Sequence, residues 1–67
     1  MMKIYMVMDG VAYEGESVVE VFANKEDAEQ YREELVKEDL EDYEVKSEQE
    51  LLDTYGQYYE VKEMEVH

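Results

Sequence analysis

The sequence contains no cysteine, no proline and no tryptophan, and only six lysine and arginine residues. Without cysteine, no disulfide can cross-link the chain and no thiolate can bind zinc. This absence is compatible with a reducing compartment. The longest apolar stretch, Ile4 to Met8, is too short to cross a bilayer or to serve as a signal peptide. We therefore expect a cytoplasmic protein.

Groups suited to catalysis are equally scarce. The single histidine, His67, is the last residue, where chains fray. Ser17 and Ser47 have no basic partner nearby in the sequence. Carboxylate pairs arise by chance among twenty acids, and 67 residues barely supply the cleft that a glycosidase-type pair needs. We expect no enzyme, no catalytic residues and no cofactor.

Metal and phosphate sites lack their usual patterns. Asp39, Glu41 and Asp42 are clustered, but the sequence has no D-x-D-x-D-G calcium loop. It also has no glycine-rich phosphate loop, because its three glycines stand at expected turns. We expect weak, non-specific association of divalent cations and no dedicated metal site.

Negative charge is the most pronounced feature of the chain. Twenty aspartate and glutamate residues give a formal net charge of -14 at pH 7, whereas a small domain usually carries a magnitude of about 2 to 8. Such a charge repels nucleic acid and anionic lipid, which excludes both as direct partners. Because 45% of the residues are hydrophobic and seven are tyrosine, we expect a folded domain rather than disorder. We expect residues 1–67 to form a single acidic domain.

Three segments have the composition of β-strands. Met2–Met8 is apolar on both alternating faces, which is typical of a central strand covered on both sides. Residues 9–15 contain Asp-Gly and Glu-Gly pairs and predict a loop. Ser17–Ala23 and Tyr58–Val66 complete the set, the former pairing with the first strand as a hairpin.

The middle of the chain has the pattern of a helix. Asn24 is the predicted N-cap, and Ala28, Tyr31 and Leu35 recur at helical spacing as the buried stripe. Acidic residues replace apolar ones on this stripe near residues 38–42. We expect the helix to end, kink or change its packing there.

A second, short helix is indicated by the capping-box spacing of Ser47 and Glu50. It would cover Glu48–Tyr55 and stop at Gly56. The predicted fold class is α+β, a small β-β-α-β domain. Its three strands form an antiparallel sheet in the order 2-1-3, with one main helix on one face.

Two details of this sheet follow from the apolar pattern. The apolar residues of the last strand change phase between Val61 and Met64, which predicts a bulge near residues 62 and 63. With the main helix on one face, Tyr5 and Val7 need another cover on the other face. The short helix, a second copy of the chain or the target are the alternatives, and we interpret this face as a sign of an interface.

Three sequence strings carry a resemblance: M-K-I-Y-x-V, V-x-x-V-F-x-x-K-E-x-A-E-x-Y and Y-Y-x-V-x-E-x-E-V. The matching residues include Lys3, Tyr5, Val7, Val18, Val21, Phe22, Lys25, Ala28, Tyr31, Tyr58, Val61 and Val66. In these strings the chain resembles small uncharacterised β-β-α-β proteins of bacteriophages and Gram-positive bacteria. Residues 38–56 have no counterpart in the resemblance. It implies a phage or mobile-element source and no particular activity.

The main helix carries a ridge of acids. Asp27, Glu34 and Glu41 lie seven residues apart, which places them about 10 Å apart along one side, with Glu38 between neighbouring members. A surface that serves only for solubility interleaves both signs of charge, and that alternative stays open here. Tyrosines add contact energy to a charged surface. The expected partner-binding residues are Asp27, Glu34, Glu38, Glu41, Asp42, Glu44, Tyr13, Tyr43, Tyr55 and Tyr58.

These features favour a binding protein with a basic partner. Duplex DNA carries one charge per about 1.7 Å of its axis, so dense carboxylates can imitate part of a phosphate backbone. The leading hypothesis is a phage-type inhibitor that mimics DNA or RNA charge and binds the basic surface of a nucleic-acid-binding host protein, as anti-CRISPR or anti-restriction proteins do. One alternative is an antitoxin or immunity-type protein that neutralises a basic enzyme. The other is a homodimeric structural accessory protein.

Overall fold

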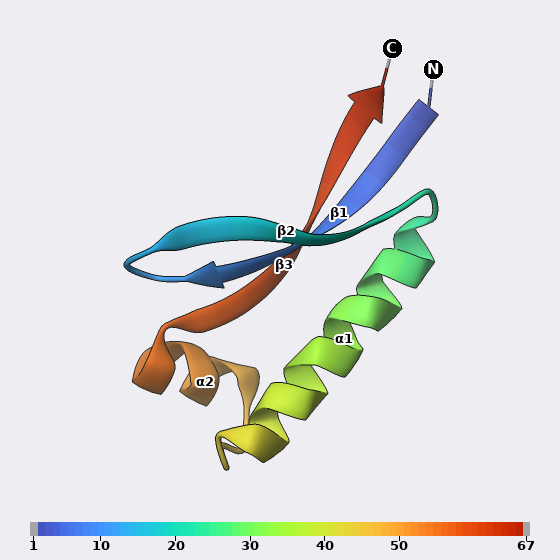
Figure 1. Cartoon of the computed structure of the whole chain (residues 1–67). Helices are drawn as coiled ribbons and strands as arrows, with labels where there is room; N and C mark the ends of the chain where they lie inside the picture. Colours follow the sequence, from blue (N-terminus) through green and yellow to red (C-terminus); the bar gives the residue numbers. More distant parts are fainter. Residues whose placement is uncertain (1, 67) are drawn as a thin grey trace.

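The computed structural model describes residues 2–66 and folds them into one sheet and two helices (Figure 1). The order along the chain is β1 (Met2–Val11), β2 (Gly15–Phe22), α1 (Lys25–Asp42), α2 (Glu48–Tyr55) and β3 (Gln57–Val66). The strands lie in the order β2-β1-β3, and both pairs are antiparallel. The predicted α+β fold, with sheet order 2-1-3 and a second short helix, is confirmed.

Helix α1 begins where the sequence places its cap and runs without a break to Asp42. The Asn24 side chain accepts a hydrogen bond of 2.9 Å from the backbone N–H of Glu26. At the other end Glu44 adopts a φ of 56°, and the Val45 N–H donates to the Leu40 carbonyl at 3.1 Å. This is the Schellman ending, in which glycine is the usual left-handed residue.

Helix α2 uses both predicted terminal residues. The Ser47 hydroxyl accepts from the Glu50 N–H at 3.2 Å, and the Glu50 carboxylate accepts from the Lys46 N–H at 3.0 Å. Gly56 has a φ of 70° and ends the helix by donating to the Leu52 carbonyl at 2.8 Å. Leu51 is completely buried, so α2 closes this end of the fold.

Helix α1 covers the face of the sheet that carries Tyr5 and Val7. Phe22, which is paired with Tyr5, contacts the Tyr31 ring of α1 at a centroid distance of 5.4 Å, and Val7 is fully buried. The expectation that this face needs another cover is therefore wrong. A central strand that is apolar on both sides does not specify which side the helix covers. The open face is the opposite one.

The predicted bulge in the last strand is also wrong. Pairing of β3 with β1 is continuous from Met2 opposite Val66 to Val11 opposite Gln57. The apolar phase changes because the two ends of β3 have their apolar residues on different faces of the sheet. The structure instead places an irregularity in β2, where Val7 and Met8 face Glu20 and Val18.

Strand β1 extends through part of the predicted loop. It continues to Val11, and only residues 12–14 form the turn. Gly10 lies inside the strand, where a Cβ atom would approach Cζ of Tyr58 to 2.3 Å. Gly10 therefore makes room for the Tyr58 ring on the neighbouring strand rather than forming a turn.

Candidate protein-binding site

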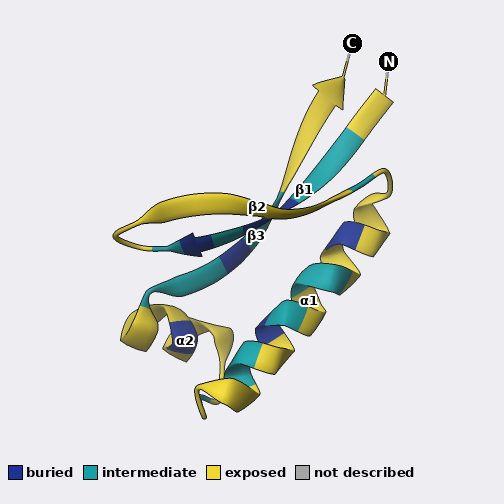
Figure 2. Ribbon diagram, in the orientation of Figure 1, coloured by how far each residue is buried: buried dark blue, intermediate teal, exposed yellow. Residues whose placement is uncertain are grey.

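The acidic ridge, defined as Asp27, Glu34, Glu38 and Glu41, is exposed on α1. The opposite side of the helix is fixed to the sheet by buried Ala28 and Val36 (Figure 2). Because the buried side sets the rotation of the helix, the ridge has to face away from the sheet. The predicted arrangement of these four carboxylates on one exposed side of the helix is confirmed.

Cations of this chain neutralise acids outside the ridge. Within residues 2–66, the ion pairs shorter than 4.0 Å involve Lys3, Lys25, Arg32 and Lys62. Their carboxylate partners are Glu16, Glu29, Glu48, Glu60 and Glu63. The ridge carboxylates take part in none of these pairs, so their field is directed at solvent.

The ridge ends beside a pair of aromatic rings. Tyr43, the C-cap of α1, stacks on Tyr55 of α2 at a centroid distance of 4.6 Å and an interplanar angle of 34°. Both side chains are exposed, at 41% and 48%, and Leu52 on α2 is also exposed. Exposed aromatic rings that are already held by stacking lose little side-chain entropy on binding. The predicted acids Asp42 and Glu44 lie exposed on both sides of Tyr43.

The two remaining tyrosines of the predicted site differ from each other. Tyr13 is 96% exposed in the turn between β1 and β2. The neighbouring residue, Ala12, donates its N–H to the Gly56 carbonyl at 2.9 Å, which places this turn beside the end of α2. Tyr58 is only partly exposed, since its ring lies across Gly10. Tyr58 therefore serves packing more than contact with a partner.

The environment of Tyr58 also disfavours its ionisation. Burial, followed by the nearby charges of Glu16 and Glu60, raises the pKa of its phenol above the ordinary 10.0, while Lys62 acts in the other direction. The hydroxyl thus stays protonated at neutral pH.

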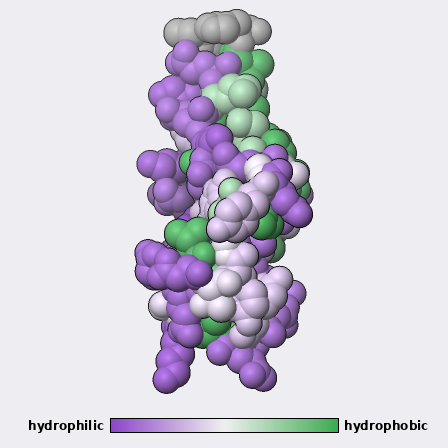
Figure 3. All heavy atoms as spheres, turned by 90° about the vertical axis from the view of Figure 1, so that its left-hand side faces the viewer, coloured by the Kyte–Doolittle hydropathy of each residue, from purple (hydrophilic) through white to green (hydrophobic). Residues whose placement is uncertain are grey.

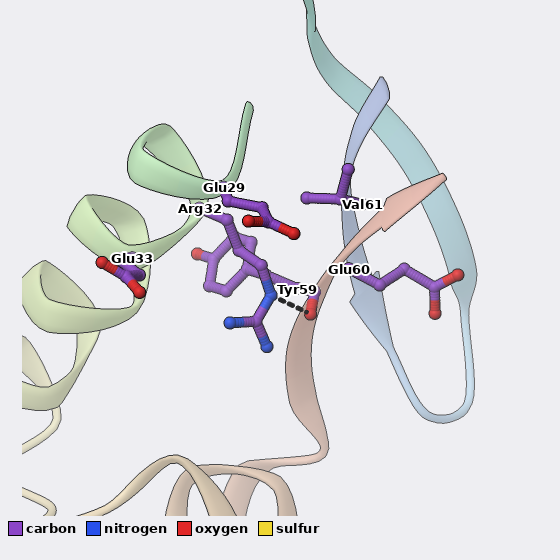
Figure 4. Close-up of a pocket in the computed structure, with 6 residues that line it drawn as sticks. All are labelled: Glu29, Arg32, Glu33, Tyr59, Glu60 and Val61. Carbon is purple, nitrogen blue, oxygen red and sulfur yellow. Dashed lines mark hydrogen bonds between the residues drawn. The ribbon is translucent and has the colours of Figure 1, made fainter. Parts of the chain in front are cut away.

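A groove of about 370 Å³ separates α1 from β3 (Figure 4). Its lining residues are Glu29, Arg32, Glu33, Tyr59, Glu60 and Val61. Arg32 fills the middle: its Nε donates to the Tyr59 carbonyl at 2.9 Å, and its guanidinium also contacts Glu48. The guanidinium is therefore occupied by the chain itself and ties α1 to both β3 and α2.

Tyr59 is the second tie between helix and sheet. Its hydroxyl donates to the Asp39 carboxylate at 2.5 Å. Burial, and then this hydrogen bond, raise the pKa of the Tyr59 phenol well above its ordinary value of 10.0. The interaction explains how Asp39 can occupy the sheet-facing side of α1 without ending the helix.

Sequence reasoning missed Leu52, Arg32 and the Tyr59–Asp39 pair. Leu51 and Leu52 are adjacent on a short helix, so only one of them can face the core, and this spacing could have identified the other as exposed. The position of Asp39 on the apolar stripe was a sign of a buried donor, but no pattern in the sequence identifies Tyr59 as that donor.

Two further features were sought in residues 2–66, a cluster of metal-ligating side chains and a helix able to cross a membrane. Between residues 2 and 66, no three His, Cys, Asp or Glu side chains are grouped so that they could hold a metal ion. Neither α1 nor α2 combines the length and apolar character that crossing a bilayer requires.

Comparisons with known proteins found no match. No protein-family model, no curated protein and no solved structure matches it. The interpretation of the site therefore depends on its own geometry.

Proposed function

We propose that this chain is a binding protein that imitates the charge of a nucleic acid and occupies the basic surface of a nucleic-acid-binding protein. In this proposal it is an inhibitor of the phage type, such as an anti-CRISPR or anti-restriction protein, without enzymatic activity. It acts in the cytoplasm of the host cell.

The acidic ridge is the observation that carries this proposal. The ridge places four carboxylates along residues 27–41 of α1, a length of about 21 Å, or one carboxylate per about 7 Å. This is the spacing of about every second phosphate of a DNA strand, which carries one charge per 3.4 Å. Two of the three cations on α1, Lys25 and Arg32, are engaged within the chain.

Charge and contact area have separate roles in this proposal. The ridge steers the approach to a basic groove and is sensitive to salt, because exposed charges act over about 10 Å at 0.1 M ionic strength. The Tyr43–Tyr55 pair supplies buried contact once the surfaces meet. The two terms can therefore be separated by mutation.

Competition with DNA tests the proposal. The chain is immobilised and used to capture proteins from a nuclease-treated bacterial lysate at about 0.1 M salt, followed by elution with a duplex oligonucleotide. We expect DNA-binding proteins to be captured and then displaced by the duplex or by about 1 M salt, where the screening length falls to about 3 Å. Capture that resists both would contradict charge mimicry.

The stacked tyrosines favour a second candidate function. An antitoxin or immunity-type protein binds one dedicated basic enzyme, and aromatic hot spots are typical of such tight, specific interfaces. In that case Tyr43→Ala with Tyr55→Ala should abolish capture of a single protein, and a DNA duplex should not displace it. A DNA mimic would lose less from these substitutions than from neutralising its ridge.

A further inference from the structure

The open face of the sheet, on the side away from α1, is apolar. The pairing of the strands places nine hydrophobic residues on it: Met2, Ile4, Met6, Met8, Val18, Val21, Tyr58, Met64 and Val66. Five of them, all except Ile4, Met6, Met8 and Tyr58, are more than 40% exposed. Figure 3 shows hydrophobic atoms along one edge of the upper half of the molecule, beside hydrophilic atoms.

The irregularity in β2 contributes directly to this face. Val18 and Val21 are three residues apart and would lie on opposite faces of a regular strand. The extra residue, Val19, lets Val18 face Met8 and Val21 face Met6, so that both valines join the open face. Bulges of this kind re-aim side chains and are built features of a sheet.

We propose that this open face binds a second copy of the chain, forming a homodimer in which two sheets pack face to face with both α1 helices outside. The proposal goes beyond the function inferred above and does not depend on it. The choice of occupant follows from charge and from area.

Charge on the open face is nearly balanced, unlike that of the whole chain. Its charged residues are Glu16, Glu60 and Lys62, with Lys62 within 3.2 Å of Glu16 and 3.5 Å of Glu60. Their net charge is -1, compared with -14 for the chain. Packed helix and sheet layers are about 10 Å apart, so the two acidic ridges would be separated by about 30 Å, several screening lengths at physiological salt. Self-association through this face therefore avoids the repulsion between ridges.

The dimensions of the chain exceed those of a compact monomer of its size. Its accessible surface is 4926 Å², whereas a monomer of 8.0 kDa usually has about 4,450 Å². The radius of gyration is 12.8 Å, against about 11 Å for a compact domain of this length. A specific interface buries about 1,000 Å² or more in total, so each chain would contribute about 500 Å², which is similar to the excess of its surface over that of a compact monomer.

The methionines make this face directly observable. Four of the five methionines of the chain lie on it, namely Met2, Met6, Met8 and Met64. In a chain labelled at its methionine and leucine methyl groups, dilution should shift the resonances of these four methionines. The methyl groups of Leu35, on α1 across the sheet, and of the buried Leu51 serve as the internal control.

Sedimentation of matched variants completes the test. Val18→Lys with Val21→Lys places two charges on exposed positions of the open face, and we expect the dimer dissociation constant to rise by more than about tenfold. Tyr13→Lys, at an exposed position outside the face, should leave it unchanged. Raising the salt concentration should not dissociate the dimer, since its contacts are apolar.

Three results would overturn the proposal. These are a monomer at every concentration, a dimer that survives both lysines, and dilution shifts confined to the leucines. Neutralising the acidic ridge should leave the dimer intact, so failure here is distinguishable from failure of the proposed function.

Discussion

Neutralising part of the acidic ridge should make the isolated chain more stable. The ridge variant combines Glu34→Gln, Glu38→Gln and Glu41→Gln. These side chains are exposed and take part in none of the ion pairs among residues 2–66, so no such pair is lost. The screened attraction of Lys37 to Glu34 and Glu41 is lost, and the removed repulsion between Glu38 and Asp42 offsets part of it. Glutamine has nearly the helix propensity of glutamate, which leaves charge as the main difference.

The size of the gain follows from the spacing on α1. Glu34 and Glu38, and Glu38 and Glu41, are neighbours about 6 Å apart on the helix surface. In water their repulsion is about 0.7 kcal/mol per pair, which screening at 0.15 M salt reduces to about 0.3 kcal/mol. Glu41 also lies in the last turn, which contains no basic residue, and opposes the helix dipole by about 0.3 kcal/mol.

Together these terms predict a gain of about 1 kcal/mol in the free energy of unfolding, or a rise in Tm of about 5 °C for a domain of this size. Urea denaturation followed by circular dichroism measures the free energy without adding salt. At about 1 M salt, where the screening length is about 3 Å, most of the gain should disappear.

The control is the paired-acid variant, Glu29→Gln, Glu48→Gln and Glu63→Gln, which changes the net charge equally. Its carboxylates form ion pairs with Lys25, Arg32 and Lys3. It should therefore be less stable than the ridge variant. A ridge variant that is less stable than the wild type, or a gain that persists at high salt, would refute the assignment of the ridge as mutually repelling and unpaired.

Further predictions concern the ties and the helix ends. Tyr59→Phe removes the hydrogen bond to Asp39 and should cost about 1 kcal/mol in urea denaturation. Because folding raises the pKa of Tyr59, the hydrogen bond stabilises the chain fully below the unfolded-state pKa of 10.0 and less as the pH rises above it. If the wild type and Tyr59→Phe differed in stability by the same amount at high pH, this reasoning would be wrong. Glu44→Gly, at a φ of 56°, should stabilise the chain by about 1 kcal/mol, while Gly56→Ala, at a φ of 70° and close to Ala12, should destabilise it by a similar or larger amount. Thermal unfolding measures both, and shifts of the same sign would contradict the left-handed assignment of these two residues.

Much of the fold follows from local sequence signals. Asn24, Ser47 and Gly56 act within one turn of their own positions, which is why the helix ends could be predicted. The strand order follows from Met2–Met8, whose apolar residues on both faces require a central place in the sheet.

The incorrect structural predictions concern features that depend on tertiary contacts. Which face of β1 the helix covers depends on Phe22 meeting Tyr31, a contact that strand periodicity does not encode. The role of Gly10 depends on the Tyr58 ring of a neighbouring strand, so the glycine looked like a turn residue. The bulge in β2 escaped prediction because a run of valines keeps the same hydrophobic pattern in either register.

The exposed acids of the candidate site could be placed from helical periodicity alone, whereas its aromatic part could not. Periodicity identifies the side of α1 that faces solvent, so the ridge was predictable. The stacking of Tyr43 on Tyr55 depends on how the loop between the helices folds back, and the sequence of that loop does not reveal it.

Capture from a bacterial lysate by the wild type, the ridge variant and the paired-acid variant tests the central claim most directly. The two variants have the same net charge and differ only in where the neutralised acids lie. We predict that at about 0.1 M salt the ridge variant loses at least about tenfold of the captured basic protein, while the paired-acid variant retains most of it. Equal capture by the two variants would contradict the claim that the acidic ridge of α1 binds the partner.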